Sequence, residues 1–325
     1  MGKRKRCLFL GFIALALHLG TAAAQEYPQR PVQVIVPFGG GSGSDVIARI
    51  LFERIGRKLG QNFVIDNRPA AGGNVGSAAV AKSAPDGYTL LFNASGPLAV
   101  NKALYKNLPF DPEQDFEPIS LVAILPNLLV VSGKMPVASV SEFIALASRS
   151  PTPLNYSSPG IGSSTHIAAA YFAHATGLKM THVPYLSTTQ LVGDLISGEV
   201  PVSFLFLSAV AGPVQAGQVK ALAVTGGDRL SALPNVPTVR EAGVSNYESA
   251  GWFAVVGPRG MPGPIVERLN REIADALAAP DIVAKLGELG AHPKASTPAQ
   301  LRQFMSSETA KWKDVIARTG ISVEQ

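Results

Sequence analysis

Two loops rich in glycine and serine are the places in this chain where residue types and spacing favour chemistry. The first, Gly39-Gly40-Gly41-Ser42-Gly43, follows a β-branched run at residues 32–36, and the second, at residues 158–165, follows a run at residues 154–157. Glycine lets the backbone turn sharply and approach a ligand closely. Each loop opens a predicted helix, whose first N–H groups lack helical partners and attract anions. Both loops can therefore bind a small anion, although a tight turn without a ligand explains either loop equally well.

Motifs that would carry catalysis or nucleotide binding are missing. The first loop has neither the Lys-Ser/Thr of a P-loop nor the G-x-G-x-x-G spacing of a dinucleotide site, and no G-x-S-x-G occurs in the sequence. His166, His174 and His182 are eight residues apart without an H-E-x-x-H pattern, so we expect packed or surface imidazoles and no metal site. Donors without a nucleophile and base favour a binding protein over an enzyme, and we expect no cofactor.

The first hundred residues alternate between strand and helix patterns, which predicts an α/β fold with a parallel sheet and helices on both faces. Strands are expected at residues 32–36, 63–66 and 88–92. Ser44 or Asp45 is expected to cap the first helix, since their side chains accept from free N–H groups of the first turn. An apolar stripe along that helix predicts its buried face: Ile47, Leu51, Ile55 and Leu59.

The second half of the chain repeats this arrangement before it becomes helical. Ser139 and Glu142 fit a capping box for a helix that ends near Ser148. Ser158-Pro159-Gly160-Ile161-Gly162 forms the second loop, at the end of a strand and the start of a helix. Further strands are expected at residues 180–183, 200–207, 220–225 and 251–257, and closing helices at residues 262–278, 282–289 and 298–318.

The N-terminus reads as a secretory signal peptide at residues 1–24. Lys3-Arg4-Lys5-Arg6 precedes an apolar stretch, and Ala22-Ala23-Ala24 offers a cleavage site before Gln25. The chain has 28 Lys+Arg and 23 Asp+Glu; without the four basic residues at positions 3–6, 24 basic face 23 acidic residues. A nearly neutral mature chain without a basic stripe excludes nucleic acid as a partner. Its only cysteine, Cys7, leaves with the signal peptide, so we expect no disulfide.

A length of 325 residues favours two domains of ordinary size. Apolar runs split by Pro126 mark the first crossing between them, and the polar, proline-rich stretch at residues 228–247 precedes the return. The glycine–serine loops would then face each other across a cleft, each at the carboxyl end of a strand, where doubly wound sheets bind ligands.

Several ordered motifs make the chain similar to a known family. They are Tyr27-Pro28, Val34-Ile35-Val36-Pro37-Phe38, Asn67-Arg68-Pro69, Ala71-Gly72-Gly73-Asn74, Pro85-Asp86-Gly87-Tyr88-Thr89-Leu90, Asn155-Tyr156-Ser157-Ser158, His182-Val183-Pro184-Tyr185, Ala221-Leu222-Ala223-Val224-Thr225, Leu233-Pro234-Asn235-Val236-Pro237-Thr238 and Glu241-Ala242-Gly243. Together they resemble the Bug family, the extracytoplasmic solute receptors of tripartite tricarboxylate transporters.

The resemblance implies a type II periplasmic-binding-protein fold, in which two α/β domains hold the ligand in a hinged cleft. Residues 25–125 plus 248–325 would form domain 1, residues 126–247 domain 2, with hinges near Pro126 and residues 247–251. It further implies a periplasmic, monomeric receptor that binds a small carboxylate or amide and passes it to membrane subunits. The predicted ligand-binding residues are Phe38, Gly39, Gly40, Gly43, Ser44, Asp45, Asn93, Ser95, Ser158, Gly160, Gly162, Ser163, Ser164, Tyr185 and Phe204.

The chain departs from the family pattern at Leu186 and Leu205, where relatives often place Lys and Asp. If both leucines line the cleft, the ligand has one carboxylate or amide head and an apolar body, because an apolar wall cannot satisfy a second carboxylate. Two alternatives to a transport receptor stay open. One is a secreted hydrolase on a similar scaffold, and the other is a binder that serves a sensor kinase.

Overall fold

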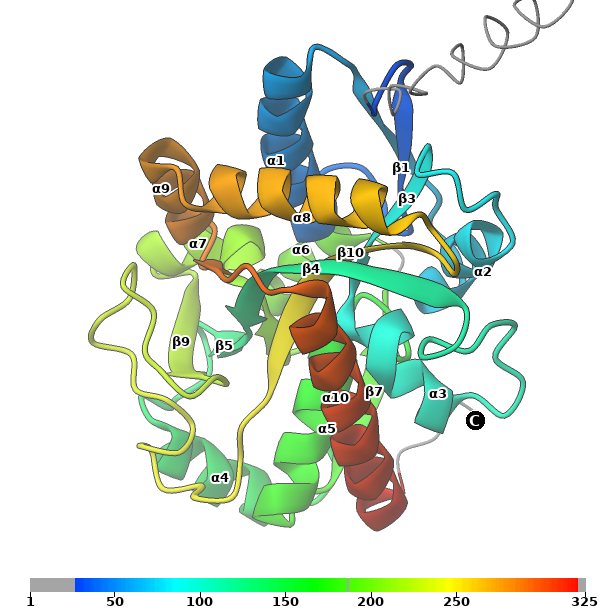
Figure 1. Ribbon diagram of the computed structural model, residues 1–325. Coiled ribbons are helices and arrows are strands. Elements are labelled where there is room, and N and C mark those ends of the chain that lie inside the picture. Colours follow the sequence, from blue (N-terminus) through cyan, green and yellow to red (C-terminus); the bar gives the residue numbers. More distant parts are fainter. Residues whose placement is uncertain (1–26, 186, 321–325) are drawn as a thin grey trace, which may run out of the picture.

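The computed structural model describes residues 27–185 and 187–320 of the chain. Two β-sheets, each flanked by helices, lie side by side in Figure 1. The first lobe, as we call it, comprises elements β1 to α3 with β4 and β10 to α10, and the second lobe comprises β5 to β9 with their helices. The predicted signal peptide lies outside the described residues. Among the described residues, no helix combines the length and apolar character that crossing a membrane requires.

The first sheet has the strand order β11-β4-β10-β3-β1-β2. Its strands are β1 (Val32–Val36), β2 (Phe63–Asn67), β3 (Thr89–Ala94), β4 (Phe116–Pro126), β10 (Ala250–Pro258) and β11 (His292–Pro293). The strands β1, β2 and β3 are parallel, but β10 runs antiparallel to both β3 and β4. The parallel arrangement predicted for the first hundred residues is confirmed for β1, β2 and β3. The later strand β10 adds antiparallel pairs, because an apolar run buried on both faces does not encode strand direction.

The second sheet has the order β7-β6-β8-β5-β9. Its strands are β5 (Leu128–Ser132), β6 (Leu154–Ser158), β7 (Met180–Pro184), β8 (Val202–Leu205) and β9 (Val219–Val224). The strand β6 is parallel to β7 and β8, whereas β5 is antiparallel to β8 and β9. The strand expected at residues 200–207 is shorter than predicted, since α7 (Leu207–Gln215) already begins at Leu207.

Helices cover both faces of each sheet (Figure 1). They are α1 (Gly43–Leu59), η1 (Ala71–Gly73), α2 (Asn74–Ala81), η2 (Gly96–Val100), α3 (Asn101–Leu104), α4 (Val140–Arg149), α5 (Ser164–Thr176), α6 (Thr188–Ser197), α7, α8 (Gly263–Leu277), α9 (Pro280–Glu288) and α10 (Pro298–Thr319). The stripe predicted on α1 is buried at Ile47, Leu51 and Ile55.

Local capping differs from the prediction at two helices. Ser42, and not Ser44 or Asp45, caps α1: its hydroxyl accepts from the backbone N–H of Asp45. The helix starts one turn earlier than the apolar stripe suggested, because Gly43 and Ser44 join it. Ser139 caps α4 as expected, but the Glu142 carboxylate accepts from the backbone N–H of Ala138, so the reciprocal half of a capping box is missing.

Helix α10 connects the two lobes. Its Glu308 carboxylate accepts from the indole N–H groups of Trp252 on β10 at 3.0 Å and Trp312 at 3.1 Å. Farther along, Trp312 meets the ring of Tyr171 on α5 edge-on at 6.1 Å. The end of α10 therefore packs on the second lobe, as Figure 1 shows by the position of α10 beside α5.

The chain passes between the lobes at two neighbouring places. Asn127 separates β4 from β5, and Ser249 lies just before β10; Thr225, which follows β9, bonds to both residues. The Asn127 N–H donates to the Thr225 hydroxyl at 2.8 Å, and the Thr225 N–H donates to the Asn127 carbonyl at 2.8 Å. Ser249, just before β10, donates its N–H to the Thr225 carbonyl at 2.9 Å. The crossing segments are thus tied to one another.

Candidate functional site

A buried carboxylate holds the first glycine loop in shape. Asp45, 4% exposed, accepts from the backbone N–H of Gly41 at 2.9 Å and from the Asn67 amide at 3.0 Å. The guanidinium of Arg49, one turn along α1, donates to the same carboxylate at 2.9 Å. Asn67 also donates to the carbonyl of Phe38 at 3.0 Å. Three of the roughly four acceptor sites of the Asp45 carboxylate are therefore used in shaping the loop.

The charge state of Asp45 follows from these contacts. Burial alone raises the pKa of a carboxyl, but the hydrogen bonds from Arg49, Gly41 and Asn67 outweigh it, so the pKa of Asp45 is lowered below its usual 3.8. The carboxylate stays ionised at neutral pH and next to the N-terminus of α1, where the helix dipole favours a negative charge.

Serine hydroxyls shape the second loop in the same way. Ser163 caps α5, since its hydroxyl accepts from the N–H of His166, and it donates to the carbonyl of Gly160 at 2.7 Å. Ser158, at the end of β6, accepts from the N–H of Gly160 at 3.1 Å. Gly160 and Gly162 have φ of 134° and 80°, values that favour glycine. The predicted residues Ser158, Gly160 and Ser163 thus make one turn.

Two neighbouring histidine rings, tilted by 39° to one another, lie beside this turn. The rings of His166 and His182 are 4.2 Å apart, and Tyr156 stacks on His182 at 5.1 Å. His182 Nε2 and the Ser158 hydroxyl share a hydrogen bond of 2.7 Å, and the Gly162 N–H donates to His166 Nδ1 at 3.3 Å. His166 therefore carries its proton on Nε2. The Gly162 N–H is therefore bonded to His166 and is not available to a ligand.

The histidine rings are neutral at neutral pH. Burial, and to a smaller extent the neighbouring His182, lowers the pKa of His166 to about 3. Burial lowers the pKa of His182 to about 4. Neutral imidazoles can accept hydrogen bonds, which charged ones cannot. The packed imidazoles expected from the sequence are present at these two positions, and they serve as the base of the second loop.

Both loops lie at the junction of the lobes, each close to residues of the opposite lobe. A Cβ added to Gly43 would lie 3.6 Å from the Ser208 hydroxyl and 3.9 Å from the Phe206 ring. On the other side of the junction, a Cβ added to Gly96 would lie only 2.9 Å from the carbonyl oxygen of Gly162. Glycine at position 96 thus permits the second loop to approach the first lobe closely.

Free hydrogen-bond donors gather at this junction. Among residues 27–185 and 187–320, the backbone N–H groups of Gly43 and Ser44 on α1, and of Ser164 and Thr165 on α5, make no hydrogen bond. Within the same residues, the hydroxyls of Ser44, Ser95 and Ser164 also have no partner. Both helix N-termini therefore keep donors available for an anion.

Three other predicted ligand-binding side chains contact neighbouring residues within their own lobe. The Asn93 amide donates to the Ser77 hydroxyl at 2.7 Å, and its carbonyl accepts from the N–H of Ala94. The Tyr185 hydroxyl donates to the Asp194 carboxylate at 2.7 Å. Phe204 is fully buried and packs on Phe172 with ring centroids 5.5 Å apart. These three side chains stabilise the lobes, and we leave them out of the proposed contact set.

The apolar wall that was expected in the second lobe has no support from Leu205. This side chain is 2% exposed and belongs to the core cluster that β5, β8, α6 and α7 form. Leu186 lies outside the described residues. The expectation of a ligand with an apolar body rested on these two positions, so it loses its structural basis.

Sequence reasoning missed the residues that support the loops from behind. In the sequence, Asn67 is only part of a family motif, and His166 and His182 are expected to be packed or surface imidazoles. Phe206 and Gly251 were also missed: a Cβ at Gly251 would lie 3.0 Å from the Phe206 ring and 3.2 Å from the Ser164 hydroxyl. A signal existed only for Phe206, an aromatic residue just after a strand, because the others depend on contacts between distant segments.

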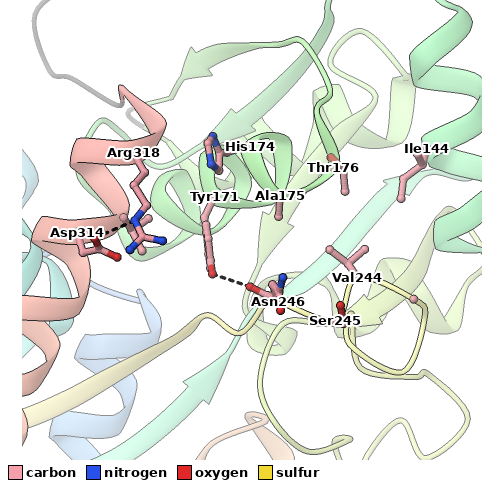
Figure 2. Close-up of a pocket in the computed structure, with 12 residues that line it drawn as sticks. Ile144, Tyr171, His174, Ala175, Thr176, Val244, Ser245, Asn246, Asp314 and Arg318 are labelled. Atoms are coloured by element: carbon pink, nitrogen blue, oxygen red, sulfur yellow. Dashed lines mark hydrogen bonds and ion pairs between the residues drawn. The ribbon is translucent and has the colours of Figure 1, made fainter.

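A separate cavity of about 530 Å³ lies on another part of the surface (Figure 2). It is bordered by α5, the segment at residues 243–246 and the end of α10. In it the Tyr171 hydroxyl donates to the Asn246 carbonyl, and Asp314 pairs with Arg318 on α10. None of the predicted ligand-binding residues lines this cavity. Size alone does not make it the functional site, since the free donors lie at the loops.

No cluster of metal-ligating side chains occurs in the part of the chain that the structure describes. Among these residues, no carboxylate or thiolate completes such a set with His166 and His182. The site is therefore best described by its amide and hydroxyl donors.

Comparison with known proteins gives these features a context. The family described as "Tripartite tricarboxylate transporter family receptor" matches residues 47–321. Protein BugT of Bordetella pertussis is 36% identical to this chain over 314 residues, which cover 96% of each protein. The similarity thus extends over both lobes.

Solved structures agree with this family match. The Rhodopseudomonas palustris protein Rpa4515, solved with adipate, is 37% identical, has a TM-score of 0.87, and is covered to 99% by 91% of this chain. MatC (Rpa3494) from the same organism, solved with bound malate, is 31% identical with a TM-score of 0.83, at 89% of this chain and 100% of that one. The predicted fold class, an α/β periplasmic binding protein, is confirmed.

Proposed function

Because this chain belongs to the receptor family of tripartite tricarboxylate transporters, we propose that it binds one small organic acid, or a related amide, between its lobes. We further propose that it delivers this solute to the membrane subunits of such a transporter. The family is one of solute-binding receptors, and the Bug resemblance seen in the sequence is confirmed. The solute, the binding residues and the site of delivery are the parts that we propose here.

The observation that carries the proposal is the set of free donors at the junction of the lobes. Helices α1 and α5 each present two N–H groups and one serine hydroxyl without a partner among the described residues. A carboxylate accepts several such bonds at once and gains from the positive end of each helix dipole. Ser44 and Ser164, with Gly43 and Thr165, are therefore the contacts that we favour most.

The relatives suggest the size of the solute. Adipate and malate, the molecules in the structures of Rpa4515 and MatC, are both dicarboxylates. A molecule with two carboxylates can place one head at α1 and the other at α5. We therefore place dicarboxylates first among the candidate solutes of this chain.

Binding requires the lobes to separate and close again, because the second loop already touches the first lobe at Gly96 and Gly72. We propose residues 25–125 plus 248–325 and residues 126–247 as the two domains, with hinges at Asn127 and Ser249. Two tied crossing segments limit the motion to a rotation about that line. The proposed active form is a monomer in the periplasm, exported by the segment before Gln25.

A thermal-shift screen tests the proposal. Monocarboxylates, dicarboxylates, tricarboxylates and their amides are added separately, since a ligand at one hundred times its Kd stabilises the folded state by about 2.7 kcal/mol. We expect a dicarboxylate to raise the Tm of the wild type. The double variant Ser44→Ala with Ser164→Ala should lose most of that shift, whereas Ser231→Ala, at an exposed position, should keep it.

Three outcomes of this screen would contradict parts of the proposal. If no acid or amide changes the Tm, the proposal of an organic-acid receptor is wrong. If the double variant keeps the full shift, the solute binds elsewhere, and the cavity beside α10 becomes the next candidate. Turnover of esters or amides by the purified chain would favour the hydrolase alternative instead.

A further inference from the structure

The most unusual polar group of the molecule is the side-chain amide of Asn127. This residue is fully buried and lies where the chain passes from the first sheet to the second. Its backbone is satisfied on both sides by Thr225. Neither Nδ2 nor Oδ1 has a hydrogen-bond partner among the described residues. Buried amides almost always have partners, so a completely unpaired one requires an explanation.

The neighbours of Asn127 make this position stand out further. Pro126 and Leu128, on either side, are apolar and buried. Leucine or valine at position 127 would avoid the cost of burying two donors and one acceptor without partners. An amide that stabilises nothing in the ligand-free chain is better suited to a group that arrives from outside.

The register of the strands indicates which face Asn127 occupies. Leu125 is paired with Gly251 on β10, and side chains two residues apart on an extended strand share a face. A Cβ at Gly251 would lie 3.0 Å from the Phe206 ring and 3.2 Å from the Ser164 hydroxyl. Asn127 is therefore on the face where Ser164, at the N-terminus of α5, and Phe206 meet. This is the floor of the proposed binding site.

A second buried amide points to the same kind of ligand. Asn101 is fully buried; its Nδ2 donates to Asn74 Oδ1 at 2.7 Å, but its own Oδ1 has no partner among the described residues. That oxygen would lie 3.1 Å from a Cβ at Gly162, in the second loop. The loops supply donors in excess, whereas two amide oxygens near them accept nothing. A solute that brings only carboxylate oxygens cannot satisfy those acceptors.

We propose that Asn127 is a specificity-determining residue, whose amide donates to an oxygen of the solute and accepts from a hydroxyl, amino or amide N–H group beside it. The inference rests on the proposed solute-receptor function and narrows its ligand class. The chain then prefers 2-hydroxy, 2-amino or amide-bearing acids over plain dicarboxylates of the same length. Asn101 Oδ1 contributes a second acceptor for such a donor.

Matched probes and one variant test this inference. Calorimetry compares three four-carbon acids: succinate, malate, which adds one hydroxyl, and succinamate, in which an amide replaces one of the two carboxylates. The wild type should bind malate or succinamate at least about ten-fold tighter than succinate, the value of one added hydrogen bond. In Asn127→Leu this ratio should fall to roughly three-fold or less. The exposed Asn155→Leu serves as the control and should keep the wild-type ratio.

The Tm of the ligand-free protein gives an independent readout. If the amide has no partner, Asn127→Leu should melt at the wild-type temperature or above it, because an unsatisfied group is removed. A lower Tm than that of Asn155→Leu would show that the amide has a structural role and would overturn the inference. An unchanged preference in Asn127→Leu, or equal affinity of the wild type for succinate and malate, would overturn it as well. If none of the three acids binds, the proposed function fails for four-carbon acids, while the Tm comparison still decides the role of the amide.

Discussion

Removal of the Asp45 carboxylate is the sharpest test of how the first loop is held. In Asp45→Ala, the Gly41 N–H and the Asn67 amide each lose an ionised acceptor, at 2.9 and 3.0 Å. Hydrogen bonds to charged groups contribute about 1.5–3 kcal/mol each, and water replaces part of this loss because the loop is exposed. We neglect the bond from Arg49, whose side chain is 53% exposed and screened by solvent. The expected destabilisation is therefore about 2–3 kcal/mol.

The chain provides a matched control for this change. Asp314 and Arg318 form the same i,i+4 pair on α10, but both side chains are more than half exposed. Asp314→Ala should cost under about 1 kcal/mol. At about 2–4 °C per kcal/mol for a chain of this size, Asp45→Ala should lower the Tm by about 4–12 °C and the control by only a few degrees. Calorimetry at pH 7 measures both.

The pH dependence of the Tm provides a second test of the role of Asp45. The pKa of Asp45 is lowered in the folded state, so its stabilisation is complete above the unfolded value near pH 4 and is lost as the pH falls through the folded pKa. The Tm difference between wild type and Asp45→Ala should therefore be constant from pH 5 to 8 and shrink below pH 4. Equal Tm changes in Asp45→Ala and Asp314→Ala at pH 7 would refute the reasoning.

Three further predictions follow from the second loop and the hinge. Gly96→Ala should weaken solute binding by about ten-fold or more, since its Cβ would lie 2.9 Å from the Gly162 carbonyl. The control Gly287→Ala, in α9 and with nothing within 4 Å of its Cβ, should bind normally, and equal affinities of the two variants would show that the contact does not matter. His166 and His182 have pKa values lowered to about 3 and 4 in the folded chain, so below pH 6.5 the unfolded chain binds more protons than the folded one. The Tm should therefore fall steadily from pH 6.5 to 4.5. A His182→Phe variant whose Tm falls as steeply as that of the wild type would contradict this. Small-angle scattering should show a smaller radius of gyration at saturating solute, and an unchanged radius would exclude closure about the hinge.

Local sequence determined most elements of the fold. The β-branched run at Val32–Val36, the apolar stripe of α1 and the turn at Gly87, with φ of 84°, each follow from side-chain periodicity or glycine geometry. The glycine–serine composition of both loops also marked where α1 and α5 begin. These features depend on residues within a few positions of one another, which is why they can be read without the fold.

The direction of β4 and β10 was decided only by the tertiary structure. Strands buried on both faces are apolar throughout, so their sequence does not show which neighbour they pair with or which way they run. The antiparallel pairing follows from the path of the chain, which leaves the first sheet at Asn127 and returns at Ser249. No local pattern contains that information.

The same distinction applies to the candidate site. The sequence identified Ser44, Gly43 and Ser164, because a loop followed by a helix start leaves donors free whatever lies around it. It could not show that the Asp45 carboxylate accepts a hydrogen bond from Asn67, or that the Gly162 N–H donates to His166. Whether a polar side chain faces a ligand or another residue depends on partners far away in the chain, and only the packed structure brings these partners together.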